Sequence, residues 1–145
     1  MSDEILERVQ EDTRVAMKAG ERERVGTLRM LASSLQQDRK EGKGDAVAVL
    51  QRERKKRIEA AEAFESAGRA ERAEAERAEA ALIEAYLPEQ VSDEELERIV
   101  AAAIESTGAS DVKGMGKVIG VVIGQVHGRA DGKRVSTMVR ERLGA

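Results

Sequence analysis

The sequence has no cysteine, no tryptophan, one proline, one tyrosine and one phenylalanine among its 145 residues. The absence of cysteine excludes disulfides, thiol nucleophiles and thiolate metal sites. A single proline argues against a turn-rich β-sandwich. No apolar run approaches the roughly 18 residues of a transmembrane helix, and the first residues are acidic, so we predict neither a membrane span nor a signal peptide. These absences predict a soluble, cytoplasmic protein that does not contact membranes.

Alanine, glutamate, lysine, leucine and arginine make up 77 of the residues. This composition is typical of long helices, because these side chains lose little rotamer freedom in a helix. Apolar residues recur at helical spacing in successive segments, and no segment has a convincing strand pattern. We therefore predict an all-α fold. The first four helices are expected at 2–19, 22–41, 46–67 and 69–87.

Pro88 marks the clearest boundary in the chain, since proline cannot continue the helix that precedes it. The prediction is an N-terminal domain of long helices at 1–87 and a small three-helix tail domain at 88–145. Each helix of the tail has a candidate N-cap, in order Ser92, then Ser110 or Asp111, then Asp131.

The net charge of −3 argues against a general nucleic-acid coat, and we expect no DNA binding. This average hides an asymmetry, because residues 109–145 carry seven basic and only three acidic side chains. Local charge decides contact with a polyanion, so the C-terminal region is the first candidate for such a contact. A second basic run, Arg52–Arg57, is flanked by acidic residues that partly cancel its field, and we rank it below the C-terminal region.

Gly116, Gly120 and Gly124 lie four residues apart within the predicted sixth helix. A glycine inside a helix costs about 1 kcal/mol relative to alanine, so three on one face need an explanation. Either another helix packs closely against their backbone, or a ligand such as a phosphate approaches it. We favour the packing interpretation. The flanking residues match neither a nucleotide phosphate loop nor a dinucleotide-binding motif.

Three stretches together resemble one known family: residues 24–35 (RVGTLRMLASSL), residues 86–90 (YLPEQ), and residues 115–133, which include MGKVIG and GRADGK. The chain is similar to the GatB/YqeY family, small stand-alone relatives of the C-terminal region of the B subunit of the tRNA-dependent Asp/Glu amidotransferase. The resemblance covers essentially the whole chain. It implies an N-terminal helical domain followed by a three-helix tail domain. In the amidotransferase the tail domain helps to hold the tRNA body, and the family label includes carbon–nitrogen ligase activity with glutamine as amido donor.

The residues themselves do not support independent chemistry. Amide transfer from glutamine needs an activated serine or cysteine nucleophile, and the serines lie in no nucleophile-elbow motif. The lone His127 is expected at a helix end, where it interacts favourably with the helix dipole rather than acting as a base or a metal ligand. We predict no catalytic residue, no metal site and no cofactor.

Binding of tRNA is the function that the resemblance and the charge pattern together predict. The candidate contacts are the basic residues around the last two helices: Lys113, Lys117, Arg129, Lys133, Arg134 and Arg140. With so few aromatic residues, RNA would be recognised by shape, phosphates and 2′-hydroxyls rather than base by base. The chain is then an accessory protein that contributes RNA docking. The alternative is a helical adaptor that binds a protein partner in translation without contacting RNA.

Overall fold

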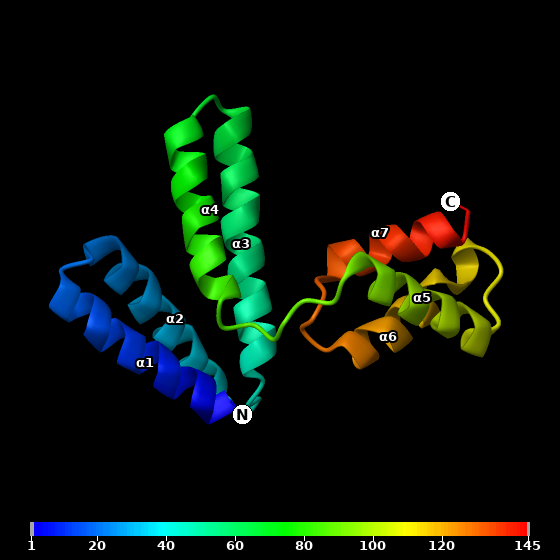
Figure 1. Ribbon diagram of the computed structural model, residues 1–145, viewed down its shortest axis with the longest axis horizontal. Coiled ribbons are helices and arrows are strands. Elements are labelled where there is room, and N and C mark those ends of the chain that lie inside the picture. Colours follow the sequence, from blue (N-terminus) through cyan, green and yellow to red (C-terminus); the bar gives the residue numbers. More distant parts are fainter. Residues whose placement is uncertain (1, 145) are drawn as a thin grey trace. The chain divides into compact units, whose positions relative to one another are not determined.

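The computed structural model describes residues 2–144, with side chains from residue 4 onwards, and over this range it contains seven α-helices and no strand (Figure 1). The predicted all-α class is confirmed. A 3-10 turn, η1 (Val112–Gly114), precedes the sixth helix. None of the described helices is both long enough and apolar enough to span a membrane. The helices are α1 (Ser2–Ala19), α2 (Arg22–Lys40), α3 (Ala46–Ser66), α4 (Ala70–Glu84), α5 (Asp93–Thr107), α6 (Met115–Val126) and α7 (Gly132–Arg142).

Side chains cap the starts of α3 and α5. The carboxylate of Asp45 accepts a hydrogen bond from the backbone N–H of Ala48 at 3.1 Å. The hydroxyl of Ser92, predicted as a cap, accepts one from the backbone N–H of Glu95, also at 3.1 Å. These bonds satisfy amide groups that have no partner within the helix, so they fix where each helix begins.

The fourth helix ends at Glu84, three residues before the predicted end. Beyond it the buried side chain of Tyr86 donates its hydroxyl hydrogen to the Asp12 carboxylate on α1, and the Arg8 guanidinium lies 5.0 Å from the ring centre. Burial raises the pKa of Tyr86 far above its ordinary value, and the neighbouring Asp12 raises it further. The hydroxyl therefore remains a donor, and its hydrogen bond holds the segment that follows α4 against α1.

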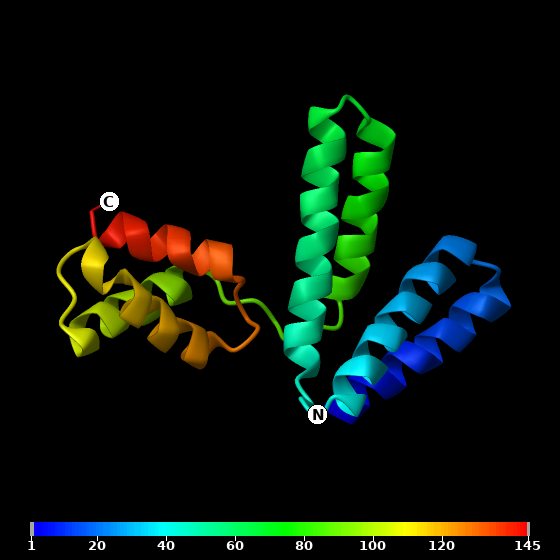
Figure 2. The ribbon, with the colours of Figure 1, turned by 180° about the vertical axis from the view of Figure 1, so that it is seen from behind.

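The first compact unit ends at Leu87 and contains α1 to α4. Helices α1 and α2 form one hairpin, and α3 and α4 form a second (Figures 1 and 2). On α2, Leu31 is fully buried, whereas Val25 and Ala32 are only partly buried. All four helices contribute side chains to a single core: Leu6, Val9, Ala16, Leu28, Leu31, Leu35, Ala46, Val49, Leu50, Ile83 and Tyr86.

Small residues form the contact between α3 and α4. Ala61 of α3 and Ala73 and Ala80 of α4 are buried. These alanines do not belong to the core of the unit. The outer part of this hairpin is therefore held by the alanine contact and by ion pairs between the two helices, such as that between Arg77 and Glu65.

The second compact unit begins at Pro88 and contains α5, α6 and α7 around a separate core. Helices α6 and α7 lie side by side and run in opposite directions, so the start of α6 lies beside the end of α7 (Figures 1 and 2). Residues 127–131 form the short turn that joins them. The core is rich in valine: Val91, Leu96, Val100, Ala103, Val118, Val122, Val126, Ala130, Val135 and Val139.

Leu50 and Val15 provide a test of this core assignment. Leu50 is fully buried, whereas the side chain of Val15 is 57% exposed. Leu50→Ala should lower the free energy of unfolding by about 2–5 kcal/mol, because it leaves a cavity among well-packed side chains. Val15→Ala should change it by less than about 0.5 kcal/mol. Urea denaturation followed by circular dichroism measures both, and equal effects would contradict the assignment.

Candidate nucleic-acid interface

Arg134 bonds to the chain that precedes α5. Its guanidinium donates to the backbone carbonyl of Val91 at 2.7 Å and to the carboxylate of Asp93 at 2.8 Å. Its backbone N–H also donates to Asp131, which caps α7 as predicted. The side chain is 29% exposed. Arg134 therefore fixes the start of α5 against the start of α7, and its charge is already partnered.

Arg129 makes a second bridge to the same segment. Its guanidinium donates to the carbonyl of Glu89 at 3.2 Å and forms an ion pair with Glu95 at 3.5 Å. Its own carbonyl accepts the N–H of Val91 at 2.8 Å. The side-chain amide of Gln90 donates to the carbonyl of Gly128 at 3.0 Å, so three successive residues before α5 are tied to the α6–α7 turn. Two of the six predicted RNA contacts are thus engaged in holding this unit together.

The other four predicted contacts have exposed side chains: Lys113, Lys117, Lys133 and Arg140. Among the residues that the structure describes, none of the four has a side-chain hydrogen bond or an ion pair. Lysine and arginine side chains in this state keep their full charge available to a polyanion.

Asp111 caps the 3-10 turn rather than α6, by accepting the backbone N–H of Lys113 at 2.9 Å. The predicted start of the sixth helix, directly after Ser110 or Asp111, is therefore wrong, and the helix starts at Met115. Lys113 consequently lies in the turn before the helix, and Lys117 lies in its first turn. Both remain close to the partially positive end of α6, which favours anions.

The free cations do not form one cluster. Lys113 and Lys117 lie at the start of α6, whereas Lys133 follows its end, at the start of α7 (Figure 1). The 12 residues of α6 span about 18 Å at 1.5 Å per residue. Arg140 lies seven residues, or two turns, after Lys133 on the same face of α7, and so lies nearer the end of the unit that carries Lys113. The structure thus arranges these side chains along two antiparallel helices.

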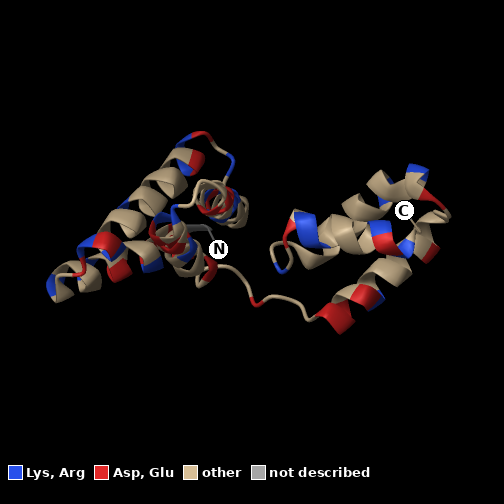
Figure 3. Ribbon diagram, turned by 90° about the horizontal axis from the view of Figure 1, so that it is seen from above, with Lys and Arg blue, Asp and Glu red and all other residues tan. Residues whose placement is uncertain are grey.

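The acidic residues of this unit are concentrated elsewhere. The first turn of α5 carries Asp93, Glu94 and Glu95, and Figure 3 shows acidic residues gathered at this helix. Helix α6 contains no acidic residue, and Lys117 is its single charged side chain. A polyanion would therefore be repelled from α5 and attracted to α6 and α7.

The glycines of α6 face open space, so the packing interpretation is wrong. Gly116, Gly120 and Gly124 are exposed, and a Cβ atom built on any of them would meet no heavy atom within 4 Å. The helix packs through its opposite face, with Val118, Val122 and Val126 in the core. What remains on the outer face is bare backbone beside Lys117, with Ile123 43% exposed next to it.

The glycine with a packing role is Gly114, which no pattern in the sequence separates from the others. A Cβ atom at this position would lie 2.6 Å from the Cβ of Ala109, in the loop after α5. Real Cβ atoms do not approach so closely, so a side chain here would displace the loop. Glycine at 114 therefore allows the loop to pass over the 3-10 turn.

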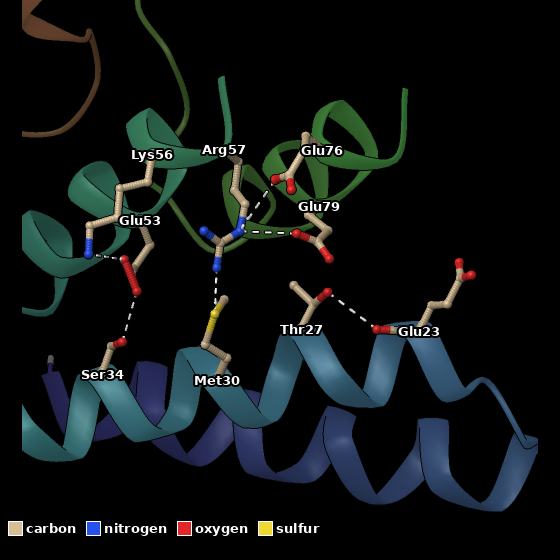
Figure 4. A network of polar contacts seen from close by, with 9 residues as sticks. All are labelled: Glu23, Thr27, Met30, Ser34, Glu53, Lys56, Arg57, Glu76 and Glu79. Carbon is tan, nitrogen blue, oxygen red and sulfur yellow. Dashed lines mark hydrogen bonds and ion pairs between the residues drawn. The ribbon is translucent and has the colours of Figure 1, made fainter. Parts of the chain in front are cut away.

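Two arginines of the rival basic run on α3 have acidic partners on α4. Arg57 pairs with Glu79 at 3.0 Å and Glu76 at 4.0 Å, and it also contacts the sulfur of Met30 (Figure 4). Arg54 pairs with Glu84 at 3.5 Å. These arginines stabilise the contact between α3 and its neighbours, so their charge is less available to RNA.

Glu53, in the same run, is a buried carboxylate between α2 and α3. It accepts a hydrogen bond from the hydroxyl of Ser34 at 2.9 Å and pairs with Lys56 at 3.2 Å (Figure 4). Burial alone would raise the pKa of Glu53, but the hydroxyl and the ammonium group outweigh burial, so its pKa lies below the ordinary value. Glu53 is therefore ionised at neutral pH and serves as an acceptor between the helices.

His127 ends α6 in a left-handed backbone conformation, with φ of 32°. Its side chain is exposed. No group of three or more metal-ligating side chains occurs among the described residues. The second unit therefore presents free cations and a stretch of exposed helix backbone on α6 and α7. Its acidic residues are concentrated on α5.

These features define a two-unit helical protein whose second unit is a three-helix module. The model of the Yqey-like protein family matches residues 6–143. The chain therefore belongs to the GatB/YqeY family, and the resemblance seen in its motifs is confirmed. Among curated proteins, none matches the chain.

Arg134 and its neighbour Lys133 form a matched pair for testing the bridging role. Arg134→Ala should lower the free energy of unfolding by about 1–2 kcal/mol, since the Val91 carbonyl loses its donor. Lys133→Ala should change it by less than about 0.5 kcal/mol. Hydrogen exchange of the α5–α7 amides reports the effect, and equal protection in the two variants would exclude the bridge.

Gly120 and Gly114 form a second pair. Gly120→Ala should raise the free energy of unfolding by about 0.5–1 kcal/mol, because alanine favours a helix and nothing obstructs its Cβ. Gly114→Ala should lower it, because the new methyl group collides with Ala109. Urea denaturation distinguishes the two, and a destabilised Gly120→Ala variant would show that the α6 face is not open.

Proposed function

We propose that this protein is an accessory tRNA-binding protein that docks RNA through α6 and α7. One observation carries the proposal: Lys113 and Lys117 are exposed and unpaired among the described residues, and they lie beside a face of α6 that has no side chains at Gly116, Gly120 and Gly124. A phosphate backbone can approach such a surface more closely than an ordinary helix face. In the related amidotransferase subunit, the tail domain helps to hold tRNA, which supports the same role here.

The chemistry of this surface suits phosphate contact better than base recognition. Its polar groups are lysine and arginine side chains and backbone at a helix start, which bind phosphates and sugars. No phenylalanine, tyrosine or tryptophan occurs in residues 88–145, so this unit lacks the side chains on which bases most often stack. The RNA is then recognised by shape and backbone, and any amide-transfer chemistry belongs to another polypeptide.

Exposed apolar residues do not favour the adaptor alternative. Val15 and Met17 of α1 are 57% and 52% exposed, but they are two residues apart and so point to nearly opposite sides of the helix. Val112 and Ile123 in the second unit are 48% and 43% exposed, and they lie eleven residues apart in the chain. Single exposed apolar side chains are normal on protein surfaces, whereas a docking site for a protein needs a contiguous patch. The RNA-binding proposal therefore accounts for more of the exposed surface.

The test is binding of unfractionated tRNA at low salt by the full chain and by Lys113→Glu/Lys117→Glu. The variant should bind about tenfold more weakly or worse near 50 mM salt, and its plot of log affinity against log salt should be flatter by about 1–2. Arg69→Glu/Arg98→Glu is the matched control, because it makes the same charge change at two exposed arginines that lie outside α6 and α7.

Circular dichroism should show equal helix content in both variants. An equal loss of affinity in the control would show that the effect comes from net charge and not from this surface. Unaltered binding by Lys113→Glu/Lys117→Glu would refute the docking surface. Capture of partners from lysate with and without nuclease separates the alternatives, because only a protein adaptor keeps its partner after the RNA is removed.

A further inference from the structure

The stretch 24–35 carries part of the family resemblance, yet the core uses only one side of it. Leu28, Leu31 and Leu35 enter the core of the first unit. Thr27, Met30 and Ser34 point toward α3 and α4 (Figure 4). Neither requirement explains five exposed residues on the remaining side of α2: Arg22, Gly26, Arg29, Ser33 and Lys40.

These five residues share one face because of their spacing. Successive members are separated by four, three, four and seven residues, which returns each to the same side of a helix of 3.6 residues per turn. From Arg22 to Lys40 the face extends over about 27 Å at 1.5 Å per residue. The surface is therefore a straight stripe with cations at both ends and near the middle.

The cations of this stripe have no acidic partner. Among the described residues, no ion pair involves Arg22, Arg29 or Lys40, and the one side-chain contact of Arg29 is with the sulfur of Met17 at 3.5 Å. The acidic residues of α2 are elsewhere. Asp38 is buried and accepts the N–H of Asp45 at 2.9 Å, and Glu23 lies about 100° around the helix from Arg22. The stripe is thus locally positive in a unit whose overall charge is slightly negative.

The side chains of the stripe indicate which kind of partner it binds. Protein interfaces are anchored by clusters of aromatic and large apolar residues, whereas none of these five residues is of that kind and Arg29 contacts the single exposed side chain of Met17. Arginine, lysine and serine are the side chains that contact phosphates. Gly26 adds a point of close approach, because a Cβ atom there would meet no heavy atom within 4 Å. An RNA backbone fits this combination better than an acidic protein does.

We propose that the exposed face of α2, formed by Arg22, Gly26, Arg29, Ser33 and Lys40, is a second phosphate-binding surface for RNA. It lies wholly within the first unit and is distinct from the surface on α6 and α7. This inference rests on the proposed RNA-binding function and extends it to the N-terminal unit. Because the contacts are to phosphates, they add affinity without adding sequence preference.

The test compares Arg22→Glu/Arg29→Glu with the same Arg69→Glu/Arg98→Glu control, using the full chain and unfractionated tRNA. The α2 variant should bind about tenfold more weakly near 50 mM salt, and its salt dependence should be flatter by about 1–2. The control should retain nearly the affinity of the unaltered protein. If circular dichroism shows that the charge reversal unfolds α2, Arg22→Gln/Arg29→Gln replaces it, and a weaker loss in the same direction is expected.

The outcomes separate this inference from the proposed function. Full tRNA affinity in the α2 variant, together with loss in Lys113→Glu/Lys117→Glu, overturns the α2 surface alone. Loss of an acidic protein partner by the α2 variant, with its tRNA affinity unchanged, overturns that surface as well. Absence of tRNA binding by the unaltered protein overturns both proposals. Equal weakening by the α2 variant and the control overturns the assignment to this face, because the effect would then reflect net charge.

Discussion

The bonds from Arg134 to the Val91 carbonyl and to Asp93 hold the second unit in its arrangement. They join the segment after Pro88 to the start of α7, and Arg129 adds a parallel bridge to Glu89 and Glu95. The valine-rich core packs the three helices together, and these bonds fix the segment before α5 against the α6–α7 turn and the start of α7. They also sort the basic residues of the unit into those that support the fold and those that remain free for a ligand.

The same sorting occurs in the first unit. Arg54 and Arg57 lie in the densest basic run of the chain, but acidic residues of α4 neutralise them and the pairs stabilise the α3–α4 hairpin. Arg22 and Arg29 belong to a sparser pattern, yet their charge stays available. Charge density along the sequence therefore does not show which basic residues are paired, because the partners lie across the contact between helices.

The glycines of α6 are another feature whose role the sequence alone does not show. Bare backbone at Gly120 and Gly124 looks like a packing groove in the sequence, because core helices use glycine in that way. In the structure the valines on the opposite face already fill the core, and the glycines face outward. A helix that keeps exposed glycines gives up helix propensity without a gain in packing. Close approach of a ligand is the interpretation that would explain why glycines stand here despite their low helix propensity.

The sequence by itself determined the all-α class, the cap of α5 at Ser92, the break at Pro88 and the family, because each depends on local spacing, local hydrogen bonds or contiguous motifs. It placed the end of α4 and the start of α6 imprecisely, since the burial of Tyr86 depends on a distant contact with Asp12 and no sequence pattern marks the close fit of Gly114 against Ala109. Only the tertiary structure decided which cations are free. Arg134 meets its partners 41 and 43 residues away in the chain, and nothing in local spacing encodes such a pairing.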